Sequence, residues 1–157
     1  MVVSGDPDLV VGPISLWALS RSTEPSADPW WVDDITCRLT AKSGAVTVEL
    51  DGAIPSRSFQ FFVDQLQGVY ERLDGRAMLD ASELGGALYV FPTTQGHVSV
   101  EASFWPYGGW DGTLRLTYRT DQTFLPPIIR SCRKILERFP VLADLKTGRA
   151  KTEAGRQ

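Results

Sequence analysis

The sequence predicts an α+β protein in which an antiparallel sheet of about six strands carries two helices on one of its faces. Three observations predict this class. Six segments have the alternation or composition of strands, two have the 3.6-residue period of amphipathic helices, and their order is β-β-β-α-β-β-β-α. Because most of these strands alternate polar and apolar side chains, we expect the helices on the apolar face and water on the other.

The first three strands are expected before residue 52. Residues 13–20, PISLWALS, are apolar on both parities and fit a buried strand or an edge strand whose second face is covered. DITCRLTAK (34–42) and AVTVELD (45–51) alternate, and Ser43-Gly44 between them is typical of a two-residue hairpin turn. The two alternating segments therefore predict an antiparallel pair with one solvated face.

The first helix is expected between residues 56 and 75, where the period changes from two to 3.6. Ser56 or Ser58 can cap its start, and Asp74-Gly75 can stop it. Burial of each large apolar side chain is worth roughly 1.5–3 kcal/mol before entropy is subtracted, so the apolar stripe must meet a sheet. The stripe consists of Phe59, Phe62, Val63, Leu66, Val69, Tyr70 and Leu73.

Three further strands follow this helix. ALYVFP (87–92) is apolar on both sides, as a central strand can be, and Gln95-Gly96 forms the next turn. HVSVEASFW (97–105) and TLRLTYRT (113–120) both alternate, so each is expected to have one face in the core and one in water.

The second helix is expected within TFLPPIIRSCRKILERFP (123–140). Thr123 can cap its start, Pro126-Pro127 suits a first turn whose amides have no intrahelical partner, and Pro140 helps to end it. Residues 1–140 then form a single α+β domain, and the polar residues 141–157 are expected to be a disordered C-terminal tail.

Length and composition limit the class of protein. A chain of 157 residues, 43% hydrophobic and 22% charged, has the size of one globular domain. It has no apolar run near the ~20 residues that span a bilayer, and its start lacks the pattern of a signal peptide. Cys37 and Cys132 have neither C-x-x-C spacing nor a histidine beside them, which predicts two buried free thiols. We expect a soluble cytoplasmic protein.

The net charge of −3 hides an asymmetry along the chain. Residues 1–111 carry 15 acidic and six basic groups, a net charge of −9, and residues 112–157 carry four acidic and ten basic groups, a net charge of +6. Eight of these ten basic groups fall on the second helix, where cations are favoured near the C-terminus, or in the polar tail. We therefore expect an acidic body that binds a protein partner, with no nucleic acid and no membrane as partner.

His97 is the only histidine, and it shares the polar side of a predicted strand with Ser99 and Glu101. Residues two apart on a strand have Cα atoms about 7 Å apart, too far for reliable hydrogen bonding between nucleophile and base. One histidine and two separated cysteines also make a poor zinc site. The sequence predicts no catalytic residue, no metal and no cofactor, and leaves a pocket near His97 and Glu101 as an alternative.

Aromatic residues in predicted loops are the more unusual feature. DPWWVDD places two tryptophans before an acidic pair that we interpret as a solvated turn, and FWPYGGWDG places Trp105, Tyr107 and Trp110 around another turn. Aromatic side chains are enriched at protein interfaces, although these rings could instead cover the core or the open sheet face. The candidate partner-binding residues are Trp30, Trp31, Asp33, Asp34, Trp105, Tyr107, Trp110 and Asp111.

Three stretches carry a resemblance to a known family: LQGVYERLDGRAML, GHVSVEASFW and LRLTYRTDQTFLPPIIRSCRKIL. Over roughly residues 35–138 the chain resembles a bacterial domain family of unknown function that is similar to the WapI-type immunity proteins of polymorphic toxin systems. Gly96, His97 and Val98 match that pattern as fold determinants, whereas the double proline and the tryptophan-rich turn depart from it. The resemblance implies a non-enzymatic protein that blocks a cognate toxin by binding it.

These observations lead to one main hypothesis and several alternatives. We expect a small binding protein, in the first place an immunity protein whose acidic body and exposed aromatic rings engage a basic toxin domain. A chaperone or adaptor for a secreted protein would have the same size and charge. An enzyme or small-ligand pocket would use His97 with Glu101 or Asp111. The sequence does not decide the oligomeric state: the protein could be a monomer, or a homodimer formed through the open sheet face.

Overall fold

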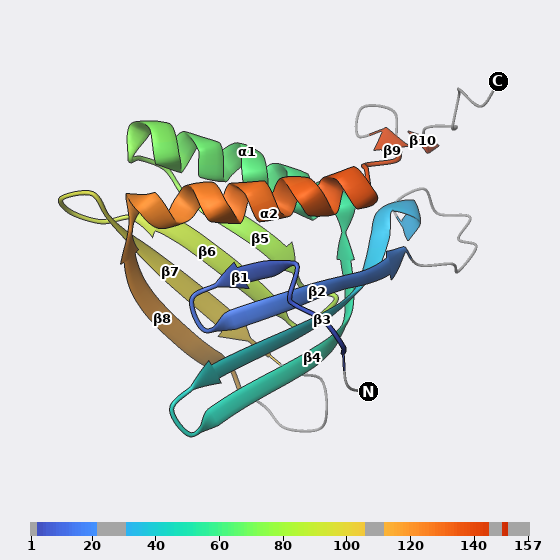
Figure 1. Ribbon diagram of the computed structural model, residues 1–157, viewed down its shortest axis with the longest axis horizontal. Helices are drawn as coiled ribbons and strands as arrows, with labels where there is room; N and C mark the ends of the chain where they lie inside the picture. The colour runs from blue at the N-terminus through green and yellow to red at the C-terminus, as the bar shows by residue number, and fades with distance from the viewer. Residues whose placement is uncertain (1–2, 22–30, 106–111, 145–148, 151–157) are drawn as a thin grey trace.

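The structure, a computed structural model, describes residues 3–21, 31–105, 112–144 and 149–150. Eight strands form two four-stranded antiparallel sheets, in the orders β1-β2-β3-β4 and β5-β6-β7-β8 (Figure 1). The predicted α+β class is confirmed, but the predicted single sheet of about six strands is wrong. The first sheet consists of β1 (Leu9–Val11), β2 (Ile14–Arg21), β3 (Asp34–Ser43) and β4 (Val46–Pro55). The second consists of β5 (Ala77–Ala81), β6 (Gly86–Pro92), β7 (His97–Phe104) and β8 (Leu114–Asp121).

One helix follows each sheet along the chain. α1 (Ser56–Arg72) comes after β4, and α2 (Leu125–Arg138) comes after β8 by way of the 3₁₀ turn η2 (Gln122–Phe124). A second 3₁₀ turn, η1 (Trp31–Asp33), precedes β3, and the two-residue strands β9 (Ala143–Asp144) and β10 (Arg149–Ala150) pair after α2. Within the described ranges, neither helix combines the length and apolar character that crossing a bilayer requires.

The difference from the predicted fold comes from two short strands. β1 has three residues, too few for alternation to distinguish it from loop, and β5 has the sequence AMLDA, in which the adjacent Met78 and Leu79 interrupt the alternation. With these strands added, each half of the chain is a four-stranded meander that is followed in the sequence by a helix. The chain leaves the first sheet through α1, so β4 and β5 are not hydrogen-bonded neighbours and the sheet does not continue.

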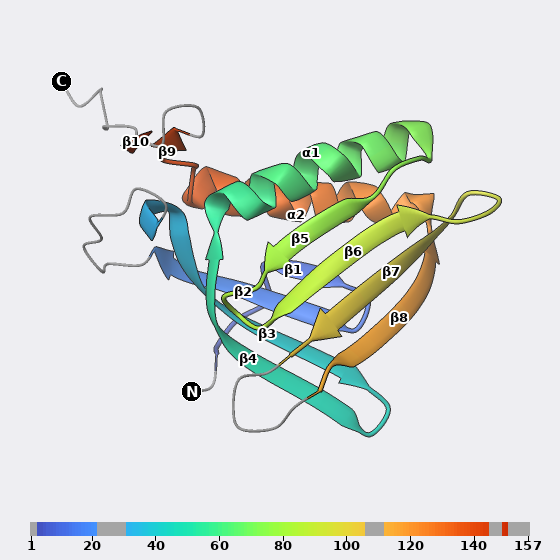
Figure 2. The ribbon, with the colours of Figure 1, turned by 180° about the vertical axis from the view of Figure 1, so that it is seen from behind.

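The two sheets face each other and share one core. Figures 1 and 2 show the sheets on opposite sides of the molecule, with the helices lying side by side across one opening between them. α1 packs against β5 and α2 packs against β1, so each helix covers an edge strand of the sheet that it does not follow in the chain. The helices therefore close the space between two sheets and do not lie on the face of one.

The predicted apolar faces of β3, β7 and β8 are confirmed. Ile35, Cys37 and Ala41 in β3 are fully buried, and Val98 and Val100 in β7 have the same inward orientation. In β8 the exposed Arg, Thr and Arg side chains alternate with half-buried Leu, Leu and Tyr. Figure 2 shows the outer face of the second sheet without a helix over it. The expectation of a solvated face is nevertheless wrong for Ser99 and Ser103, which are only 5% and 8% exposed because β7 lies between β6 and β8.

The helical stripes also enter the core. Phe59, Phe62 and Leu66 of α1 have no exposed surface, while Leu73, the last residue of the predicted stripe, is 37% exposed. Leu73 lies just beyond α1 in the left-handed conformation, with φ of 51°, so it caps the helix and points away from the core. Cys132 of α2 is fully buried among the same residues.

The predicted helix caps are wrong in position. Ser56 is the first residue of α1 and makes no capping bond, because its hydroxyl donates to the Asp33 carbonyl 3.2 Å away. Before α2 it is Asp121, and not Thr123, that caps the turn: its carboxylate accepts the Thr123 amide at 2.8 Å. These bonds from the Thr123 hydroxyl and amide lower the pKa of Asp121, because they favour the charged carboxylate.

One of the two predicted hairpin turns is confirmed and the other is displaced by one residue. Gln95 and Gly96 both have positive φ, 59° and 75°, as a type I′ turn between β6 and β7 requires. In the first sheet Ser43 pairs with Val46, which moves the expected Ser43-Gly44 turn by one residue to Gly44-Ala45.

The two sheets come into close contact at two glycines. A Cβ on Gly52 of β4 would lie 3.0 Å from the Leu84 Cα and 3.1 Å from the Glu83 carbonyl oxygen, in the turn between β5 and β6. A Cβ on Gly12, which has φ of 55°, would lie 2.9 Å from the Tyr118 ring of β8. Gly52 and Gly12 are therefore needed at these positions, because a side chain there would collide with the opposite sheet.

We expect Gly52→Ala to lower the free energy of unfolding by about 1–3 kcal/mol, because the added methyl group meets backbone atoms that cannot rotate away. Urea unfolding followed by tryptophan fluorescence measures the change. The exposed change Thr47→Ala on the same strand is the control and should stay within about 0.5 kcal/mol of the parent. An equally small effect of Gly52→Ala would contradict the close contact.

Candidate partner-binding surface

The candidate aromatic residues fall in two places along the fold. Trp31 is the first residue of η1, and Trp105 follows β7, where its side chain is half-buried and its amide donates to the Gly85 carbonyl at 2.9 Å. The other candidates on these two segments, Trp30, Tyr107, Trp110 and Asp111, lie outside the described residues. The partner-binding role of this group stays a prediction.

Asp33 is fully buried and holds several segments together. Its carboxylate accepts the Leu142 amide at 2.6 Å and lies 3.7 Å from the Arg21 guanidinium, while its carbonyl accepts the Ser56 hydroxyl. Arg21 also donates to the Pro140 carbonyl at 2.7 Å. The interpretation of this acidic pair as a solvated turn is therefore wrong: Asp33 joins the end of β2, the start of α1 and the segment after α2.

Asp34, at the start of β3, is also buried, with only 6% of its surface exposed. Desolvation raises its pKa, the positive charge of Arg57 lowers it, and the negative charges of Glu83 and Asp33 raise it further. The net effect is a raised pKa. Asp34 thus lies in a region where carboxylates from β3 and from the turn after β5 come close to one arginine.

His97 does not lie in a catalytic arrangement. It is exposed at the start of β7, opposite Asp121, and its backbone closes the hairpin with Thr93 and Thr94. Glu101 lies four residues along the same strand, about 13 Å away at the usual rise of a strand, and pairs with Arg115 at 3.4 Å. The two residues of the alternative pocket are therefore separated, and neither lines any of the three cavities described below.

The two thiols are free and inert. Burial raises the pKa of Cys37 to about 12 and that of Cys132 to about 12. Both thiols stay protonated at neutral pH, so neither is a nucleophile or a ready metal ligand. Across the described ranges, no cluster of histidine, cysteine, aspartate and glutamate side chains has the geometry of a metal site.

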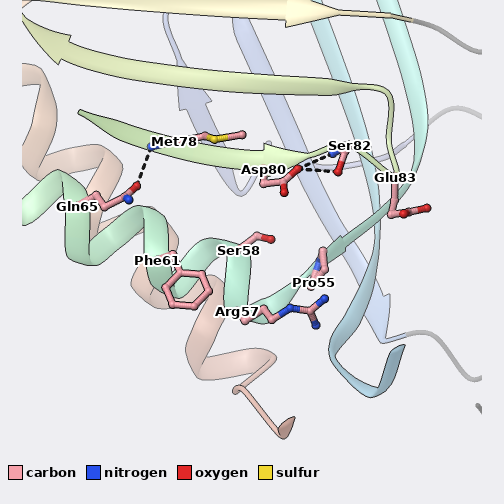
Figure 3. A pocket seen from close by; sticks show the side chains of 9 residues that line it. All are labelled: Pro55, Arg57, Ser58, Phe61, Gln65, Met78, Asp80, Ser82 and Glu83. Atoms are coloured by element: carbon pink, nitrogen blue, oxygen red, sulfur yellow. Dashed lines mark hydrogen bonds between the residues drawn. The ribbon is translucent and has the colours of Figure 1, made fainter. Parts of the chain in front are cut away.

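A pocket of about 330 Å³ lies between α1 and the free edge of β5. In Figure 3 the side chains of Phe61 and Ser58 on the helix lie across from Met78 and Asp80 on the strand. Its lining residues are Pro55, Arg57, Ser58, Phe61, Gln65, Met78, Asp80, Ser82 and Glu83.

Internal bonds shape this pocket. The Gln65 side chain accepts the outward-pointing amide of Met78 at 2.9 Å, which occupies part of the free edge of β5 (Figure 3). The Asp80 carboxylate accepts the Ser82 amide at 3.0 Å and the Ser82 hydroxyl at 2.7 Å. The pocket therefore has a rigid strand wall and a helix wall that carries a half-exposed phenylalanine, since Phe61 is 50% exposed.

This pocket was not predicted from the sequence, although one signal for it was present. Phe61 is a large aromatic residue outside the apolar stripe of α1, on the side of the helix that should face water. Asp80 and Glu83 gave no such signal, because the strand that places them opposite the helix does not alternate and was not predicted.

The other two cavities are less suited to a ligand. One, of about 20 Å³, lies between the sheets and has an almost entirely apolar lining, so it is a packing void without polar partners for water. The other, of about 360 Å³, is a groove between the helices lined by Gln60, Val63, Asp64, Arg133, Leu136 and Glu137. Neither contains a set of converging catalytic groups.

Comparison with known proteins gives one match. The model of a family described as the immunity protein WapI-like family matches residues 11–140, which include both sheets almost completely and both helices. No curated protein and no solved structure matches the chain.

We expect Asp33→Ala to lower the free energy of unfolding by about 2 kcal/mol, because it leaves the Leu142 amide and the Arg21 guanidinium without their acceptor. Thermal and urea unfolding measure the loss. Asp74→Ala removes an exposed carboxylate from a surface pair with Arg72 and is the matched control, with a much smaller expected effect. Equal stability of the two variants would show that Asp33 does not clamp these segments.

We expect the stability advantage of the parent over Asp34→Asn to decrease as the pH rises from about 4 to 7. A carboxyl group whose folded pKa lies above its unfolded pKa binds more protons in the folded state, so ionisation at higher pH favours unfolding. Urea unfolding of both proteins at several pH values gives the difference. A difference that grows with pH would mean that the Asp34 pKa is lowered.

Proposed function

This chain belongs to the WapI-like immunity protein family, and on that premise we propose that it neutralises a cognate toxin by binding it directly, without catalysis. The family match over residues 11–140 is the observation that carries the proposal. Because the match includes both sheets almost completely and both helices, it concerns the whole fold and not a single motif.

The chemistry of the described residues supports a binding role over an enzymatic one. The only histidine is exposed at a hairpin and lies far from Glu101, and both cysteines are buried with raised pKa values. A nucleophile needs a base within hydrogen-bonding distance, and the described side chains around His97 do not include such a pair. We therefore propose a protein whose surface, and not a reactive group, performs the function.

Charge favours a basic toxin domain as the partner. Residues 1–111 carry a net charge of −9. On the outer face of the first sheet Glu49 and Asp51 are more than half exposed, although both contact Arg38. Complementary charge accelerates association with a basic protein and disfavours acidic ones. The free thiols suit a reducing compartment, so we propose that the chain acts in the cytoplasm of the cell that it protects.

Affinity capture of the tagged chain from its native cells, followed by mass spectrometry, tests the proposal. We expect one basic protein in stoichiometric amount that stops growth when expressed alone and is harmless when co-expressed with this chain. A captured partner without toxicity would point to an adaptor or chaperone and would contradict the proposal. His97→Ala should leave neutralisation unchanged, since no reaction depends on the imidazole.

We expect the association rate constant with the captured toxin to fall by about tenfold or more as the ionic strength rises from about 0.01 M to 0.15 M. The reason is that the attraction between the acidic body and a basic partner is screened over a shorter distance. Stopped-flow or surface-based kinetics measures the rate constants. A rate constant independent of salt would remove the electrostatic part of the proposal and leave direct binding in place.

A further inference from the structure

We propose that the pocket between α1 and β5 anchors the toxin by taking one arginine side chain, whose guanidinium lies against Phe61 and is held by Asp80 and Glu83. This inference rests on the proposed function for the identity of the partner. The evidence for an arginine site comes from the pocket itself, so the arginine site and the proposed function can be disproved separately.

The size of the pocket sets the size of its occupant. A volume of about 330 Å³ is at the lower end of the range of ligand pockets, roughly 300–1,000 Å³, and suits one or two side chains. A whole strand would need the free edge of β5, but α1 packs against that strand and the Gln65 side chain already occupies the Met78 amide. The occupant is therefore a side chain that projects from the partner.

The apolar part of the pocket suits a planar cation. Phe61 is one of the few large apolar side chains that is about half exposed among the described residues, and Met78 lies across from it (Figure 3). Guanidinium groups stack on aromatic faces and are less strongly hydrated than ammonium groups. This distinguishes arginine from lysine as the better occupant.

The charges around the pocket are in excess on the acidic side. The pocket lining has two carboxylates, Asp80 and Glu83, which are both exposed, and one guanidinium, that of Arg57. The positive charge of Arg57 also acts on the buried Asp34 behind the lining. The lining therefore has one negative charge in excess. A guanidinium from a partner would balance this excess and could form forked hydrogen bonds with a carboxylate.

The anchor also has the features of an energetic hot spot. Binding energy at interfaces concentrates where one long side chain fills a pocket and loses its water, and arginine is one of the residues most enriched there. The wall opposite the helix is a strand held in a sheet, so little order has to be gained on binding.

The first test uses N-acetyl-arginine amide as the probe and N-acetyl-citrulline amide, which is nearly isosteric but uncharged, as its control. The chain contains two methionines, so methyl labelling of methionine gives a resolved NMR signal for Met78 within the pocket. We expect the arginine probe to move the Met78 signal in a saturable way at millimolar concentration. No movement, or equal movement with the citrulline control, would overturn the arginine site.

The second test asks whether the toxin uses this site. We expect the double variant Phe61→Ala/Glu83→Gln to bind the arginine probe and the captured toxin about tenfold or more weakly. Phe61 and Glu83 are exposed and carry no hydrogen bond of the fold described above, so the variant should remain folded, which circular dichroism and the melting temperature check. The matched control is Phe124→Ala/Glu71→Gln, which removes an aromatic ring of similar exposure and one exposed carboxylate outside the pocket.

The outcomes separate the two proposals. Weaker binding by the pocket variant but not by the control supports the anchor. If both variants neutralise the toxin as well as the parent, the anchor is wrong while the proposed function stands. If the parent neutralises no captured protein but the probe still moves the Met78 signal, the arginine site stands while its role as a toxin anchor is overturned.

Discussion

The fold depends on the mutual burial of two sheet faces. Each sheet has one apolar face, and a four-stranded meander of this size has no other means of removing that face from water. Leu16 and Ile35 of the first sheet and Val98 and Val100 of the second belong to the same cluster of buried residues. Because this core is shared, the two halves of the chain stabilise each other and neither is expected to fold without its partner.

The shared core decides where the other elements can lie. The sheets meet closely at Gly52, where only a residue without a side chain fits, and the opening between them is closed by α1 and α2. Asp33 of η1 is hydrogen-bonded both to the start of α1 and to the segment after α2, and so holds these three segments together. A carboxylate that looks like a surface group in the sequence becomes part of the interior because three segments converge on it.

The position of α1 between the two sheets also produces the pocket between α1 and β5. α1 carries the chain from the first sheet to the second, and it must run beside β5, the edge strand that it introduces. Its inner face is occupied by the core, so Phe61 on the other side is left facing the strand edge with Asp80 and Glu83 nearby. Partner recognition through such a site needs shape and charge and no reactive group, which agrees with a family of immunity proteins.

The sequence by itself determined the elements with strong periodicity. Alternation in β3, β7 and β8 and the stripe of Phe59, Phe62 and Leu66 were enough to predict which apolar side chains face the core, because each apolar side chain gains by leaving water. The family resemblance was likewise readable from local stretches, and the match over residues 11–140 confirms it.

Only the tertiary structure decided how many sheets there are and where a binding site can form. β1 is too short and β5 does not alternate, so neither was predicted, and the six predicted strands were assigned to one sheet. The burial of Asp33 and the position of Glu83 depend on contacts between residues far apart in the chain. Such contacts arise from the packing of whole elements, and no local spacing encodes them.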